Sequence, residues 1–150
     1  MMLGIKGKFY MKKADIKNSA DMFFYKAMVD FNSGKYLLKS FENDELEIDI
    51  EKIYFDFQQS AEKLFKALLT HHQIDTEKTH DISKLIKICK SNDIILQENI
   101  EILIDLTEYA VEGRYGIICD DLNDTQNYID TLDIFIQKIE KKLKIKHPSK

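Results

Sequence analysis

Arg114 is the residue whose type points most directly to chemistry, because it is the sole arginine among 22 basic side chains, all the others being lysine. A planar guanidinium binds phosphate or carboxylate through two parallel N–H bonds, which a lysine ammonium does not provide. The position therefore predicts a contact with an anionic ligand. The alternative is an internal ion pair with Glu62 or Glu108 that fixes the start of the last helix, and both roles can hold together.

A second candidate is a set of three polar side chains that recur at intervals of four residues. Gln58, Glu62 and Lys66 would form one strip along a helix, beside its apolar stripe. The strip either is a solvated face stabilised by the pairing of Glu62 with Lys66, or it lines a groove or a dimer contact. The sequence leaves both alternatives open.

Metal-ligating residues are sparse in the sequence. Of the four histidines, only His80 has the Glu-x-x-His spacing that helical-bundle metal sites use, with Glu77. A di-iron site needs that motif twice, so we interpret this copy as a turn and helix cap. Cys89 falls on an apolar face and Cys119 has no zinc-ligand spacing around it. No metal and no cofactor is predicted.

Motifs for nucleophilic or phosphate chemistry are also missing from the sequence. It contains no Gly-x-Ser-x-Gly elbow, no P-loop and no glycine-rich dinucleotide turn. This disfavours the hydrolase and kinase classes.

Apolar residues that recur every three or four positions predict the helices that must position these side chains. One begins near Ala14, and its stripe is interrupted at residues 32–34. Residues 36–41 either continue it or form a separate short helix. The other helices are expected from about Leu46 or Asp49 to His72, from Thr79 or Asp81 to Ser91, from Gln97 to Gly113, and from near Asp124 to Leu143.

The composition sets the fold class. A chain of 150 residues has the length of one domain, and 44% hydrophobic with 32% charged residues is too apolar for disorder and too charged for a membrane span. With 5 Gly and 1 Pro, few turn residues are present. We predict an all-α fold, an up-and-down bundle of four to five helices over residues 14–145, after a flexible arm over residues 1–13.

The net charge and the N-terminal residues indicate which partners and which cellular compartment to expect. The net charge of -4 disfavours a broad basic face for nucleic acid, so any RNA contact would be local. The N-terminal residues have no apolar stretch of secretory length, and two cysteines are too few for a disulfide framework. A cytoplasmic protein without membrane association is expected.

Three stretches of the chain resemble the HEPN domain family. Residues 58–68 are similar to the family's Gln-Gln-x-x-Glu-Lys-x-x-Lys-Ala-Leu helix. His80-Asp81-Ile82 is similar to its His-Asp-Leu start of the following helix, and Arg114-Tyr115-Gly116 to its Arg-Tyr-Pro junction before the last helix. The order and spacing agree over roughly residues 14–143.

The resemblance implies a helical bundle that is usually a homodimer and is often encoded beside a minimal nucleotidyltransferase. Many members are toxins that cut RNA without metal, using an arginine to stabilise phosphate charge and a histidine shortly after it as general base. Arg114 matches the arginine, but the positions for the histidine are Cys119, Asp120 and Asp121. The two acids add negative charge where a phosphate would approach, which disfavours that reaction.

Three hypotheses follow from these observations. The first is a non-catalytic module, the partner of a nucleotidyltransferase in a toxin-antitoxin-like or stress system. The second is a metal-independent RNA-cleaving toxin with a displaced base, in which Arg114 would be catalytic, and the third is a purely structural bundle. A homodimer is expected in each, because 9 Phe and 7 Tyr exceed what a small bundle hides. The module would bind a nucleotide-like ligand, RNA or a partner protein through Arg114, Tyr115, Gln58, Glu62, Lys66 and His80.

Overall fold

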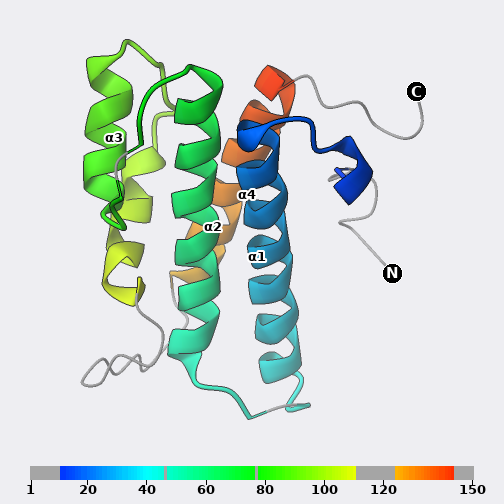
Figure 1. Cartoon of the computed structure of the whole chain (residues 1–150). Coiled ribbons are helices and arrows are strands. Elements are labelled where there is room, and N and C mark those ends of the chain that lie inside the picture. The colour runs from blue at the N-terminus through cyan, green and yellow to red at the C-terminus, as the bar shows by residue number, and fades with distance from the viewer. Residues whose placement is uncertain (1–10, 46, 77, 111–123, 144–150) are drawn as a thin grey trace.

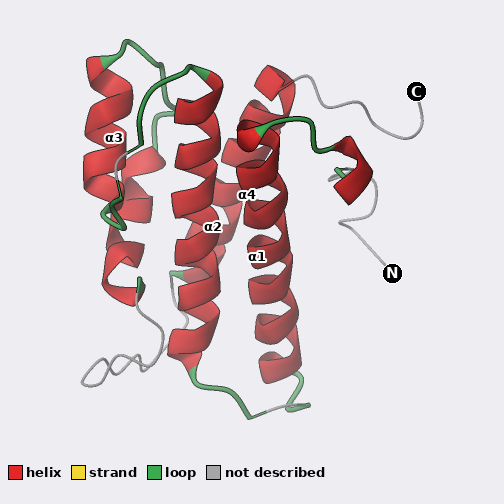
Figure 2. Ribbon diagram, in the orientation of Figure 1, coloured by secondary structure: helices red, strands yellow, loops and turns green. Residues whose placement is uncertain are grey.

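The computed structural model describes residues 11–45, 47–76, 78–110 and 124–143. Within these ranges every regular element is a helix (Figures 1 and 2). The predicted all-α bundle is confirmed, and no helix of the described ranges is long and apolar enough to cross a membrane. In chain order the elements are a short 3-10 turn η1 (Lys13–Asp15), α1 (Ser19–Glu42), α2 (Ile50–His71), α3 (Ile82–Ser91), a 3-10 helix η2 (Ile100–Tyr109) and α4 (Thr125–Leu143).

Helix α1 begins later than its apolar stripe predicts. The side chain of Asn18 accepts a hydrogen bond from the backbone N–H of Asp21 at 2.8 Å, so Asn18 caps the helix and Ser19, not Ala14, is its first residue. Most of the predicted arm 1–13 lies outside the described residues. Met11, where the described chain starts, is buried against the core.

The predicted interruption at residues 32–34 does not end α1, which runs unbroken to Glu42. A Cβ atom on Gly34 would lie 2.7 Å from Cε1 of Phe57, so the absence of a side chain lets α1 and α2 approach closely. The neighbouring Ser33 donates its hydroxyl to the carboxylate of Asp56 at 2.9 Å. Residues 33 and 34, which resemble a helix break in the sequence, therefore form contacts between α1 and α2.

Helices α1 and α2 form an antiparallel pair, side by side in Figure 1. The hydroxyl of Ser60 donates to the backbone carbonyl of Ala27 at 2.9 Å, and Lys63 pairs with Asp30 at 2.6 Å. Helix α2 also contacts α3, η2 and α4, so it is the central element of the bundle.

Helix η2 differs from the α-helix that the sequence predicts over this segment. Its buried residues are Ile100, Leu103 and Leu106, a strict repeat of three. A 3-10 helix has three residues per turn, so these side chains stack on one face. Ile104 and Thr107, which an α-helical stripe would bury, are only half-buried.

The chain runs back along α2 before α3 begins, so α3 points in the same direction as α2 (Figure 1). The predicted up-and-down order is therefore wrong at this step. Helix η2 then runs antiparallel to α3. The backbone N–H of Ile82 donates to the hydroxyl of Thr107 at 3.2 Å, while Lys90 pairs with Glu101 at 3.0 Å. The return segment thus brings the start of α3 against the middle of α2.

Candidate functional site

A buried carboxylate, Glu62, lies at the centre of the predicted polar strip on α2, and its side chain is only 6% exposed. One of its oxygens, Oε2, accepts a hydrogen bond from Nζ of Lys66 at 2.7 Å. The other, Oε1, accepts from Nε2 of Gln58 at 3.2 Å and lies 2.9 Å from Nδ1 of His80. The strip is therefore not a solvated face. It is a cluster of four side chains, Gln58, Glu62, Lys66 and His80, which we call the Glu62 cluster.

Gln58 connects α2 to the residue before α3. It is fully buried, and its Nε2 also donates to the backbone carbonyl of His80 at 3.3 Å. Its Oε1 accepts from the side chain of Gln59 at 2.7 Å. Every polar atom of the Gln58 side chain is thus satisfied inside the protein, and this amide positions its neighbours.

The start of α3 fixes the backbone at His80. The carboxylate of Asp81 accepts from the backbone N–H of Ser83 at 2.9 Å and caps the helix, and the hydroxyl of Thr79 accepts from the N–H of Asp81 at 3.1 Å. Capping residues on both sides of His80 hold its side chain above Glu62.

His80 is the exposed member of the Glu62 cluster, with 65% of its side chain accessible. A carboxylate only accepts hydrogen bonds, so Nδ1 of the ring carries the proton that faces Glu62. Nε2, on the other side of the ring, is then left for a further partner. The cluster presents an oriented imidazole at the surface.

The charge state of Glu62 follows from its contacts. Burial raises the pKa of this carboxyl, but hydrogen bonds from Lys66, His80 and Gln58 and the positive charge of Lys66 outweigh burial and leave the pKa lowered. Glu62 is therefore ionised at neutral pH, and its charge is balanced locally by Lys66.

The structure brings together four of the six side chains that the sequence singles out, namely those of the Glu62 cluster. The other two, Arg114 and Tyr115, lie in residues 111–123, outside the described residues. The positions considered for the missing histidine, Cys119, Asp120 and Asp121, fall in the same range.

Metal-ligating side chains do not converge in the part of the chain that the structure describes, where no three His, Cys, Asp or Glu residues form a cluster that could hold an ion. Glu77 of the Glu-x-x-His spacing lies outside the described residues. Cys89 is buried, and burial raises the pKa of its thiol to about 11, so it behaves as a small apolar side chain.

Comparison with known families gives one match, in which the model of the HEPN domain aligns with residues 20–142. The chain belongs to the HEPN domain family. Comparisons with curated proteins and with solved structures give no match. The matched range includes the complete Glu62 cluster and the stretch with Arg114, so these residues belong to the HEPN domain itself.

Tyr54, which the sequence analysis did not single out, joins α2 to η2 and α4 beside the Glu62 cluster. The hydroxyl of Tyr54 lies 2.8 Å from that of Thr125, and its ring centroid lies 5.0 Å from that of Tyr109. Thr125 and Tyr109 lie on either side of residues 111–123, so the segments before and after this stretch meet at one side chain of α2. Tyr54 is one helical turn before Gln58. The apolar spacing of the sequence gives no signal for the partners of Tyr54.

Proposed function

We propose that this HEPN domain is a non-catalytic interaction module that binds a nucleotide-like anion through His80, Lys66, Arg114 and Tyr115. The observation that carries the proposal is the 2.9 Å contact between buried Glu62 and exposed His80. An ionised carboxylate that orients an accessible imidazole is an arrangement suited to contacting a polar ligand. In this proposal Gln58 and Glu62 position the binding residues and do not touch the ligand.

The flanks of the stretch that contains Arg114 and Tyr115 support grouping these residues with His80. Both flanks meet Tyr54, one helical turn from Gln58. Residues on both sides of this stretch therefore lie near the cluster. A guanidinium there would supply the paired N–H donors that phosphate prefers.

Calorimetry with mono- and dinucleotides tests this proposal. We expect His80→Ala and Arg114→Ala each to weaken binding, because each removes a side chain that would contact the ligand. His71→Ala is the matched control, since His71 is exposed at the far end of α2. If the native protein binds none of these nucleotides and co-purifies with no partner from its host, the proposal is wrong.

We also propose that two copies associate through α1. Met22, Val29 and Tyr36 are 40%, 49% and 69% exposed and follow one another at intervals of seven residues. Such a repeat forms an apolar stripe that a second helix can cover. In sedimentation equilibrium we expect a dimer that Val29→Glu dissociates, while Ile134→Glu, at an exposed apolar residue of α4, leaves it intact. A native protein that sediments as a monomer contradicts this arrangement.

A nucleotidyltransferase partner, a toxin-antitoxin-like or stress role, and a cytoplasmic location belong to the same proposal. Their support is the HEPN membership and the features of the sequence. Co-purification of the tagged chain from its native host tests the partner directly.

The oriented imidazole also favours a second candidate function, metal-independent RNA cleavage with His80 as the displaced base. In this reaction Nε2 of His80 would remove the proton of a ribose 2′-hydroxyl, and the oxygen would attack the adjacent phosphorus to form a 2′,3′-cyclic phosphate. The bond from phosphorus to the 5′-oxygen of the next nucleotide would break, that oxygen would take a proton from water, and Arg114 would stabilise the charge on the phosphate. Cleavage of mixed tRNA and mRNA in chelator, lost in both His80→Ala and Arg114→Ala, would support it. If the native protein does not cleave RNA, this second function is wrong and the binding module is favoured.

A further inference from the structure

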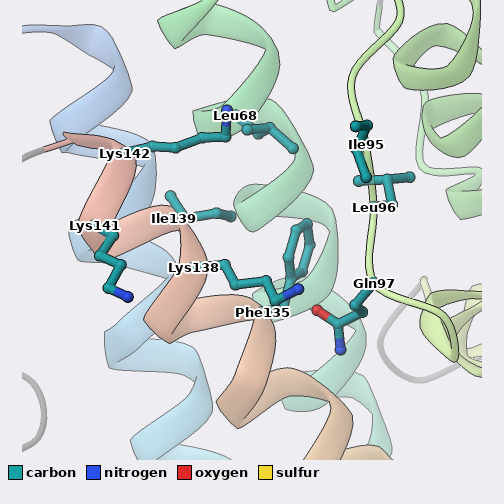
Figure 3. A pocket seen from close by; sticks show the side chains of 9 residues that line it. All are labelled: Leu68, Ile95, Leu96, Gln97, Phe135, Lys138, Ile139, Lys141 and Lys142. Atoms are coloured by element: carbon teal, nitrogen blue, oxygen red, sulfur yellow. The ribbon is translucent and has the colours of Figure 1, made fainter.

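A cavity that shares no residue with the Glu62 cluster lies between the end of α2, the last turns of α4 and residues 95–97 (Figure 3). Its volume is about 280 Å³, at the small end of the range for small-molecule sites. The side chains that line it are apolar except for one amide and three lysines. They are Leu68, Ile95, Leu96, Phe135 and Ile139, with Gln97, Lys138, Lys141 and Lys142.

Gln97 contributes a hydrogen-bond acceptor that has no partner in the protein. Its side chain is only 9% exposed, and its Nε2 donates to the backbone carbonyl of Thr131 at 3.1 Å and to Oδ1 of Asn99 at 3.2 Å. A carbonyl cannot donate, so the contact with Thr131 fixes which end of the amide is nitrogen. Oε1 is then a buried oxygen without a hydrogen bond.

The direction of this oxygen makes it part of the cavity. Figure 3 shows Oε1 of Gln97 directed toward Phe135 and Lys138, on the side where the cavity lies. A buried acceptor without a donor is rare in folded proteins and calls for a partner. An N–H or O–H group of a bound molecule would satisfy it.

The three lysines give the mouth of the cavity a positive charge within a chain of net charge -4. Lys138, Lys141 and Lys142 are exposed, and none forms an ion pair with a carboxylate of the described residues. Lys142 contacts Nε2 of His72 at 3.4 Å, an acceptor that does not neutralise it. Figure 3 shows Lys138 and Lys142 extending over two sides of the apolar floor.

We propose that this cavity binds a small aromatic anion that carries one N–H or O–H donor. The ring would pack on Phe135, Leu96 and Ile139, the donor would bond to Oε1 of Gln97, and the anionic group would meet Lys138 and Lys142. Carboxylate and phosphate share this chemistry. The chain's own terminal stretches, 1–10 and 144–150, are a poor match, because they contain lysines and no Asp or Glu.

An exposed apolar side chain, Ile95, lies at the mouth of the cavity, as expected for a site that a ligand enters from solvent. Ile95 is 93% exposed, which is unusual for a large apolar side chain beside a cavity. It would cover the outer face of a bound ring. This site is independent of the proposed function at His80, because it shares no residue with the Glu62 cluster.

Indole ligands provide a direct test, because the chain has no tryptophan and the ligand's fluorescence can be excited at a wavelength that its 7 tyrosines do not absorb. Indole-3-propionate and indoxyl phosphate share the ring and the N–H donor and differ in the anion, so comparing them distinguishes the two sources. We expect at least one of them to bind with a dissociation constant of about 1 mM or lower, and Lys138→Ala with Lys142→Ala to weaken binding. Lys87→Ala, an exposed lysine of α3, is the control.

The N-methyl analogue tests the contact with Gln97 separately. Losing one neutral hydrogen bond should weaken binding to the native protein about three- to tenfold. In Gln97→Leu the parent and the N-methyl analogue should bind equally, because the acceptor is gone. The inference is overturned if neither indole anion binds the folded native protein, or if N-methylation weakens binding equally in both proteins.

Discussion

Replacing Glu62 by glutamine should destabilise the protein strongly, although the two side chains have nearly the same size. The carboxylate is 6% exposed and accepts from three donors, on Lys66, His80 and Gln58. A glutamine offers one oxygen to these donors and adds an N–H group that faces them. Hydrogen bonds to a charged group contribute about 1.5–3 kcal/mol, and breaking a buried pair costs about 3–5 kcal/mol. Because Lys66 keeps 14% exposure, we expect an intermediate loss of about 2–4 kcal/mol in the free energy of unfolding.

The measurement is urea unfolding at neutral pH, with Glu98→Gln as the matched control on an exposed glutamate. The control should change the free energy of unfolding by less than about 0.5 kcal/mol. For a chain of this length, the loss in Glu62→Gln corresponds to a melting temperature lower by roughly 5–15 °C.

The pH dependence gives an independent check on the same carboxylate. The pKa of Glu62 is lower in the folded protein than in the unfolded chain, where it is about 4.3. Its stabilising contribution is therefore complete above the unfolded value and is lost as the pH falls through the folded value. The difference between the native protein and Glu62→Gln should shrink over that acid range. A variant as stable as the native protein at neutral pH, or a difference that does not change with acid, would refute the reasoning.

Three further predictions concern the packing of the bundle. Gly34→Ala should lower the free energy of unfolding by up to about 2 kcal/mol, because overpacking costs about 1–3 kcal/mol and the gain in helix propensity is about 1 kcal/mol. A stabilised variant in thermal unfolding would show that the helices can separate freely. Leu106→Ala should destabilise the protein by about 2–5 kcal/mol and Ile104→Ala by less, because Leu106 is fully buried and Ile104 is half-buried. If urea unfolding gives the reverse order, an α-helical stripe is favoured. In a Cys119→Ser background, Cys89 should react with a thiol reagent only as the protein unfolds, because burial raises the pKa of its thiol to about 11. Labelling of the folded protein at the rate of a free thiol would contradict this prediction.

The sequence predicts the long helices well where one face is continuously apolar, as it is along α2. It predicts the boundaries less well, because these depend on single hydrogen bonds. Asn18 caps α1 four residues after Ala14, where the apolar pattern begins, and nothing in the pattern distinguishes Asn18 from other polar residues nearby. At Gly34 the sequence shows a helix-breaking residue, whereas the tertiary contact with Phe57 determines its role.

The sequence names the four side chains of the Glu62 cluster but does not predict how they contact one another. Spacing places Gln58, Glu62 and Lys66 on one side of a helix, and the HEPN resemblance adds His80. Whether that side meets solvent or another segment depends on where the chain returns after α2, which periodicity does not encode. The unpaired oxygen of Gln97 was also hidden, since it depends on the contact between Gln97 and the backbone of α4.

Tyr54 has a consequence for how this protein can change over evolutionary time. Thr125 and Tyr109 meet this one side chain on either side of residues 111–123, so the helices are tied together before and after that stretch. A substitution at Tyr54 would disturb the end of η2 and the start of α4 together, so this position tolerates little change while the two contacts are kept.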